Sequence, residues 1–210
     1  IVLEKDMIDL KSINIIFCAR LLKSKGIDIF INLAKEFPDL RFNIYGNRDE
    51  SSKDSLSQRE IKDTLKIKNL IYHGYKKNPL LNHLDTPALL LVPSIYGEGL
   101  PRSIPEAMIL GIPVLASRKS CCGVFSNKNL YEVSENSLIN YKFALEEIID
   151  QYNNVTFIDK IKDAKTFAEK NFTEKSIVKE TCRIYEEFYE TNNIPYVINK
   201  DINDLESYLS

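Results

Sequence analysis

Six short apolar runs alternate with amphipathic stretches along this chain, and that alternation restricts the fold more than any other feature of the sequence. The runs cover residues 14–19, 41–45, 70–73, 88–92, 113–116 and 130–133. Several of them lack polar alternation, which is typical of strands that are covered on both faces of a parallel sheet. Strands that alternate with helices indicate β-α-β units. We therefore expect an α/β fold with a doubly wound, Rossmann-like parallel sheet.

Helices are predicted in the segments between the apolar runs. They cover residues 27–37, 55–65, 78–84, 101–110, 137–152, 155–171 and 173–191. The first shows apolar residues at helical spacing and stops before Pro38. Gly111 is expected as the glycine just after the fourth helix, and Thr173 as the N-cap of the last.

Composition excludes several classes of partner. Lys and Arg (28) nearly balance Asp and Glu (30), so electrostatics favour neither a nucleic acid nor an anionic membrane as the main partner. No apolar run approaches the roughly 20 residues of a transmembrane helix, and the first residues do not resemble a signal peptide. The 4 cysteines lack zinc-site spacing and are expected to be reduced thiols of a cytoplasmic protein, with a reactive Cys121–Cys122 pair left open.

The loop after the first predicted strand carries two cations. In a doubly wound sheet, ligands bind outside the carboxyl ends of the strands, and here the sequence CARLLKSKGID places Arg20 and Lys25 before a helix. Two cations beside a helix N-terminus form an anion site, and Gly26 allows close backbone approach. The alternative is a solvated basic turn. Neither GxGxxG nor GxxxxGK[ST] occurs, so dinucleotide and P-loop sites lose their main support.

The loop after the fourth predicted strand, PSIYGEGLPRSIPEA, carries two glutamates. Pro105 is tolerated only in the first turn of a helix, so the helix begins near Pro101 or Arg102. Glu98 then precedes the helix while Glu106 lies about a turn inside it, so the two carboxylates cannot share one helical face.

Two separated carboxylates are better placed to bind the two ends of an extended ligand than to act together as an acid/base pair. A carboxylate can accept hydrogen bonds from the vicinal hydroxyls of a sugar or a ribose, and the amides of Gly99 and Leu100 can hold phosphate. The alternative is that Glu98 is a surface residue and Glu106 an acid favoured near a helix N-terminus.

These motifs resemble those of the family 4 retaining glycosyltransferases, which have two facing Rossmann domains, the GT-B architecture. The resemblance runs from residue 15 to residue 189 and rests on three segments: FCARLLKSKG with the helix after it, NLIYHGY, and PSIYGEGLPRSIPEAMILGIPVLAS with its Glu-x7-Glu spacing. One segment departs from the family, because SRKSCCGVFSNKN stands where the family often has Gly-Gly and a further Glu.

The resemblance implies a role for each candidate residue. Arg20 and Lys25 would hold the donor diphosphate and stabilise the leaving nucleotide, and Glu98 would bind the transferred sugar; these three form the expected catalytic set. The expected donor-binding residues are Gly46, which lets the nucleotide pass, Tyr75 in the base-lining stretch 71–75, Gly99 and Leu100 beside the sugar, and Glu106 on the ribose. By this resemblance no metal and no other cofactor is needed.

The expected function is retaining transfer of a hexose-type sugar from a nucleotide-sugar donor, UDP-linked by family resemblance, to a glycan or lipid-linked acceptor. We expect a linker remnant over residues 1–12, a donor-binding domain over 13–192 and a tail over 193–210. Acceptor binding is expected to need an N-terminal domain, and the full-length enzyme is expected to be cytoplasmic, either free or peripheral at the inner membrane face. The alternatives are a nonenzymatic sugar-nucleotide-binding or scaffold module and, less favoured by the motifs, an epimerase or a phosphorylase.

Overall fold

The computed structural model describes residues 13–191 except residues 98 and 153 and the side chain of residue 190. The contacts within the chain divide it into two units, Ile1–Thr166 and Phe167–Ser210. The linker predicted over residues 1–12 and the tail predicted over 193–210 lie outside the described residues.

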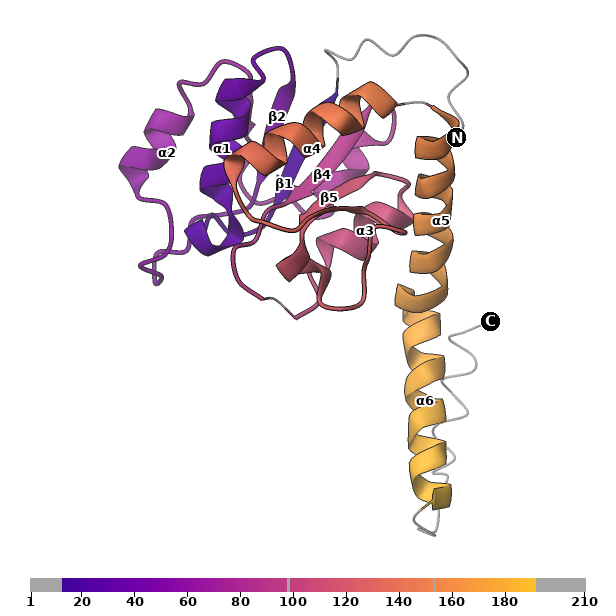
Figure 1. The fold of residues 1–210 in the computed structure, drawn as a ribbon. Coiled ribbons are helices and arrows are strands. Elements are labelled where there is room, and N and C mark those ends of the chain that lie inside the picture. Colours follow the sequence, from indigo (N-terminus) through magenta and orange to yellow (C-terminus); the bar gives the residue numbers. More distant parts are fainter. Residues whose placement is uncertain (1–12, 98, 153, 192–210) are drawn as a thin grey trace. The chain divides into compact units, whose positions relative to one another are not determined.

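A six-stranded sheet forms the centre of the first unit (Figure 1). Its strands are β1 (Asn14–Cys18), β2 (Arg41–Tyr45), β3 (Leu70–Tyr72), β4 (Ala88–Val92), β5 (Val114–Ser117) and β6 (Tyr131–Val133). Every pairing is parallel and the strand order is β3-β2-β1-β4-β5-β6. The predicted doubly wound sheet is therefore confirmed, and its winding reverses between β1 and β4, where ligands bind in such sheets.

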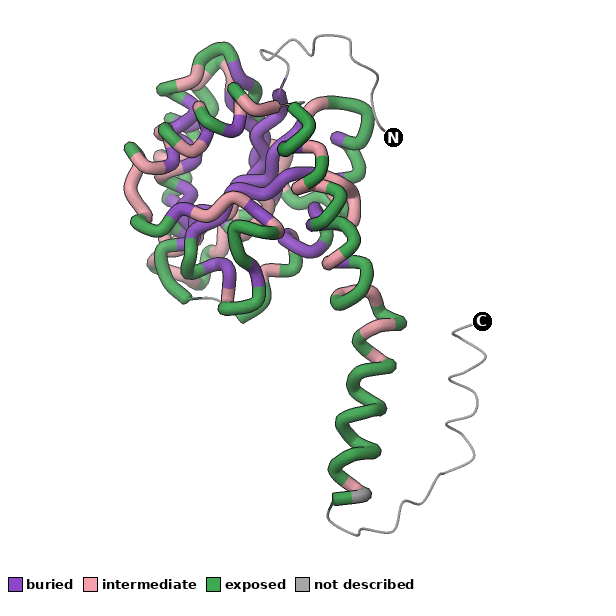
Figure 2. Tube along the Cα trace, turned by 45° about the vertical axis from the view of Figure 1, so that its right-hand side comes forward, coloured by how far each residue is buried: buried purple, intermediate pink, exposed green. Residues whose placement is uncertain are grey.

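Helices cover both faces of the sheet. Alternate side chains of each strand point to opposite faces, and since the strands are largely apolar, both faces must be buried. Ile15 and Phe17 belong to a core cluster with residues of α1 (Ile27–Glu36) and α4 (Leu138–Gln151). Ile16, which points the other way, is 0% exposed, and α3 (Ser103–Ile109) lies along β4 and β5. The four inner strands, β1, β2, β4 and β5, are buried along nearly their whole length, as Figure 2 shows.

Several predicted helices are shorter in the structure or of a different type. α2 (Gln58–Thr64) begins after Ser57, whose side chain accepts from the Glu60 amide while the Glu60 carboxylate accepts from the Ser57 amide. The helix predicted over 78–84 is the 3₁₀ helix η3 (Pro79–His83), and two more 3₁₀ helices follow strands: η2 (Lys23–Lys25) and η4 (Arg118–Cys121). Pro105 lies in the first turn of α3, as predicted.

The last two helices are α5 (Val155–Phe172) and α6 (Glu174–Thr191), and the second unit contains the end of α5 and all of α6. The Thr173 hydroxyl accepts from the Ser176 amide at 3.2 Å, which makes Thr173 the predicted N-cap. Within the described residues, no helix combines the length and the apolar character that crossing a membrane requires.

Candidate functional site

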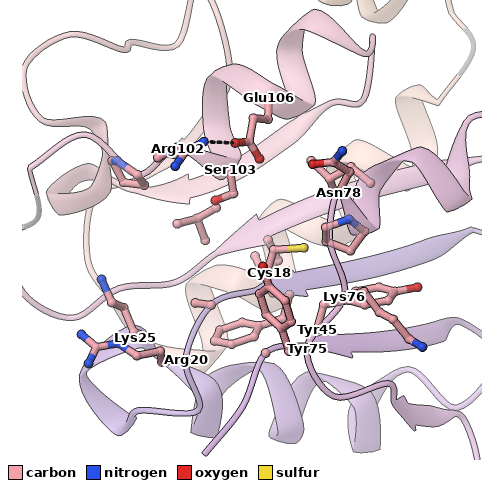
Figure 3. A pocket seen from close by; sticks show the side chains of 18 of the residues that line it. Cys18, Arg20, Lys25, Tyr45, Tyr75, Lys76, Asn78, Arg102, Ser103 and Glu106 are labelled. Atoms are coloured by element: carbon pink, nitrogen blue, oxygen red, sulfur yellow. Dashed lines mark ion pairs between the residues drawn. The ribbon is translucent and has the colours of Figure 1, made fainter. Parts of the chain in front are cut away.

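A pocket of about 620 Å³ opens at the carboxyl ends of β1, β2 and β4 (Figure 3). Its size lies within the range of small-molecule sites, roughly 300–1,000 Å³. Six of the eight predicted site residues line it: Arg20, Lys25, Gly46, Tyr75, Leu100 and Glu106. Glu98 lies outside the described residues, and Gly99 is exposed in the same loop as Leu100.

The pocket forms because the loops after β1 and β4 touch. Gly26 has a φ of 76°, and a Cβ atom there would lie 2.0 Å from the carbonyl oxygen of Pro93. Only glycine fits this contact. A hydrogen bond from the Ile95 amide to the Ser24 carbonyl, at 2.9 Å, also joins the two loops. The close approach predicted for Gly26 is therefore to the neighbouring loop.

The two predicted cations come from the loop after β1, as Figure 3 shows. The Lys25 ammonium lies 5.5 Å from the centre of the Tyr96 ring, which is a cation–π contact. Arg20, however, is bound through Nη1 to the Asp49 carboxylate at 2.6 Å. The sequence analysis missed Asp49, which lies 29 residues away in the chain.

Two backbone amides of this loop already donate hydrogen bonds within it. The Lys25 amide donates to Leu22 O at 3.0 Å and the Gly26 amide to Lys23 O at 2.8 Å. An anion beside Lys25 would therefore depend on the side chains of this loop and not on these two amides.

Gly46 and Asn47 join the loops after β1, β2 and β3. Gly46 has a φ of 143°, and a Cβ atom there would lie 1.9 Å from Ala19 O, so the glycine is required by backbone packing. The Asn47 side chain accepts from the Tyr75 amide at 3.0 Å. Tyr75 is thereby held at the pocket with its side chain 71% exposed.

Glu106 occupies the opposite wall, on α3, where its Oε1 lies 3.5 Å from Arg102 Nη2. The Cys18 thiol lies at the end of β1; burial and then the charge of Glu106 raise its pKa to about 12. Cys18 is therefore a neutral, unreactive thiol in the pocket wall. Sequence reasoning assigned no role to Arg102 or Cys18.

Tyr45 forms another part of the wall and belongs to a polar cluster with both histidines of the chain. Its ring stacks on His73 with centroids 4.4 Å apart, and its hydroxyl lies 2.9 Å from His83 Nε2. Burial is the main cause that raises the pKa of Tyr45 and lowers those of both histidines. Tyr45 lines the pocket, and the shifts favour the neutral forms of all three side chains near neutral pH.

The loop that carries Glu98 is tethered from several sides. The Asn136 amide group donates to Ser94 O at 3.2 Å, the Lys119 ammonium to Ile95 O at 2.9 Å, and the Cys122 thiol to Gly99 O. Cys122 belongs to the segment that departs from the family pattern. In this chain that segment therefore holds the loop at Gly99 through a hydrogen bond. In the described part of the chain, no three His, Cys, Asp or Glu side chains are grouped so that they could hold a metal ion.

The sequence is also similar to that of known proteins. Residues 3–133 match the family model described as glycosyl transferases group 1. The chain is 25% identical to an uncharacterized 41.2 kDa protein in the cps region of Klebsiella pneumoniae, over 85% of this chain and 47% of that protein. It is 27% identical to an uncharacterized glycosyltransferase of Haemophilus influenzae, over 67% of this chain and 38% of that protein.

The fold also matches solved structures. The structure of Anabaena HepE in complex with UDP superposes with a TM-score of 0.73 at 17% identity, over 84% of this chain and 49% of that one. The chain thus spans about half the length of HepE and of the Klebsiella relative.

Proposed function

The chain belongs to the glycosyl transferases group 1, and from that premise we propose that its pocket binds a nucleoside-diphosphate sugar, with UDP as the nucleotide. The observation that carries the proposal is one pocket, at the reversal of the sheet, with Arg20 and Lys25 on one wall and Glu106, paired with Arg102, on the other. A diphosphate requires positive charge, and a ribose diol requires an acceptor such as a carboxylate. HepE, of the same fold, binds UDP, which supports the choice of nucleotide.

In this proposal Arg20 and Lys25 take the diphosphate and Glu106 takes the ribose hydroxyls. Tyr75 lies beside the base, and Glu98 with the adjoining Gly99 and Leu100 holds the transferred sugar. The donor thus extends across the pocket between its two charged walls.

We propose further that the chain is the donor-binding, C-terminal half of a family 4 retaining enzyme. An acceptor hydroxyl of a glycan or a lipid-linked glycan attacks the anomeric carbon of a hexose-type sugar. The bond from that carbon to the diphosphate breaks on the same face, the departing oxygen gains negative charge, and the proton of the acceptor hydroxyl passes to the departing diphosphate. Arg20 and Lys25 stabilise that charge, which is usually the largest catalytic contribution. The gene of the Klebsiella relative lies in a cps region, which supports a polysaccharide as the product.

The test is calorimetry of the chain with UDP, GDP and ADP and with their glucose conjugates. We expect UDP and UDP-sugars to bind most tightly, and sugar transfer by the chain alone to be negligible. Arg20→Ala and Lys25→Ala should each weaken UDP and reduce the salt dependence of binding, because each removes a phosphate partner. Absence of binding to every nucleotide at millimolar concentration would contradict the proposal.

A further inference from the structure

We propose that Asp49 is a positioning residue for Arg20, and that residues 47–56, here called the brace, hold it in place. The inference rests on the proposed function, in which Arg20 binds the diphosphate. It adds a residue that touches no ligand but decides where the guanidinium lies before a ligand arrives.

The brace runs beside the cationic loop and is bonded to it along its length. The Leu21 amide donates to Asn47 O at 3.1 Å, and the Leu21 carbonyl accepts from the Leu56 amide at 2.9 Å. Leu22 and Ser55 form an antiparallel bridge between the two segments. The backbone that carries Arg20 is therefore fixed on the side of the brace.

Side chains of the brace strengthen this attachment. The Ser24 amide donates to Asp54 Oδ2 at 3.1 Å, and the Ser24 hydroxyl donates to the same carboxylate. The Ser55 hydroxyl donates to Leu21 O at 3.2 Å. These bonds join positions that are about 30 residues apart in the chain, so they exist only in the folded protein.

Asp49 is itself held firmly. Its Oδ1 accepts from the Ser51 amide at 3.1 Å and from the Ser51 hydroxyl at 2.6 Å, while its own amide donates to the Ser55 hydroxyl at 3.0 Å. The other oxygen, Oδ2, accepts from Arg20. The Asp49 side chain is 19% exposed whereas that of Arg20 is 62% exposed, so a well-held carboxylate orients an exposed cation.

Two physical effects of Asp49 on a bound diphosphate have opposite signs. Its negative charge repels the anion, so neutralising it would tighten binding if Coulomb repulsion dominated. Its hydrogen bond orders the Arg20 side chain before binding, and only Nη1 takes part, so the rest of the guanidinium fork can meet a phosphate. The geometry points to ordering as the larger effect, because Asp49 is bonded at both oxygens and at its amide.

The test is UDP binding by Asp49→Asn, with Glu50→Gln as the matched control. Glu50 lies in the same brace and loses the same charge on substitution, but it pairs with Arg48 at 2.9 Å whereas Asp49 pairs with Arg20. We expect Asp49→Asn to weaken UDP about three- to tenfold, the range for one long side chain that must be immobilised on binding. Glu50→Gln should not weaken UDP. In an Arg20→Ala background, Asp49→Asn should cause no further loss.

A second measurement does not depend on the variant. NMR of the Arg20 guanidinium in the ligand-free wild type should show slow rotation about the bond from Cζ to Nη1, because Asp49 holds Nη1. Free rotation overturns the proposal, as does an Asp49→Asn protein that binds UDP equally or more tightly while the wild type binds it. A wild type that binds no nucleotide contradicts the proposed function, and the positioning role falls with it.

Discussion

At the level of single side chains, Glu106 has the surroundings that its proposed role requires. It is the carboxylate on the wall opposite Arg20 and Lys25, and only Arg102 is recorded as its ion-pair partner in the described residues. That contact, at 3.5 Å, leaves the second oxygen of Glu106 for a ligand hydroxyl. Arg20 differs, because its guanidinium is already bound to Asp49 before any ligand is present.

Replacing Glu106 by Ala should weaken UDP binding by about 1.5–3 kcal/mol, the worth of a hydrogen bond to a charged group. Calorimetry measures the change. Glu36→Ala is the matched control, because Glu36 also pairs with a cation, Lys142 at 2.9 Å, but does not line this pocket.

Glu98→Ala should leave UDP binding nearly unchanged and remove the additional affinity that the sugar of a UDP-sugar provides. Equal losses for both ligands in the Glu98 and Glu106 variants would contradict the assignment of one carboxylate to the sugar and one to the ribose.

Gly46→Ala should lower the free energy of unfolding by about 2–5 kcal/mol, from backbone strain and overpacking together. The added Cβ would lie 1.9 Å from Ala19 O and 2.8 Å from Ala19 C, which are backbone atoms and cannot rotate away. Urea denaturation measures the loss. Gly97→Ala is the control, with a change within about 0.5 kcal/mol, because nothing lies within 4 Å of a Cβ atom there. Equal stability of the two variants would contradict this account.

At the level of elements, short 3₁₀ helices and loops complete the site that the strands begin. η3 places His83 against Tyr45 at the end of β2, and η4 leads to Cys122, which holds the loop at Gly99. The helix predicted over 78–84 is wrong in type, because Pro79 at its start and only five residues of length favour the tighter 3₁₀ turn.

Stability should fall as the pH drops below about 6.5, the ordinary pKa of histidine. Burial, and then the charge of His73, lower the pKa of His83 in the folded chain, so the unfolded chain binds more protons in this range. The stabilisation is present above pH 6.5 and is lost as the pH falls through the folded pKa. Urea denaturation at pH 7.5, 6.5 and 5.5 measures it.

His83→Gln should flatten this dependence, because it removes one of the two titrating rings. A slope that persists unchanged in the variant would show that carboxylates or other groups cause it.

For the whole molecule, the first unit contains the entire pocket, and its charge comes from side chains of several loops. In the proposed function, Arg20 and Lys25 neutralise the diphosphate, so binding should not need a divalent ion. We predict that UDP affinity is the same in EDTA as in magnesium or manganese, measured by calorimetry. A strict requirement for either metal would show that the phosphate subsite is wrongly assigned.

Much of the fold was predictable from the sequence because its signals are local. Apolar runs, Pro105 and Thr173 act on their own neighbours, so all six strands and the ends of several helices agree with the structure. The carboxyl ends of parallel strands meet at one edge of the sheet, so the loops that carry Arg20, Lys25 and Glu106 could be placed at one edge from the predicted strands, and the family resemblance supplied their roles.

Only the tertiary structure decided which groups touch. The Arg20–Asp49 pair, the contact of Gly46 with Ala19 and the effect of Glu106 on Cys18 each join loops that follow different strands. No periodicity or motif encodes these distances, because they depend on how the sheet brings the loops together. The sequence by itself therefore determined the strands and the edge at which the charges gather, and tertiary packing decided how each charge is held.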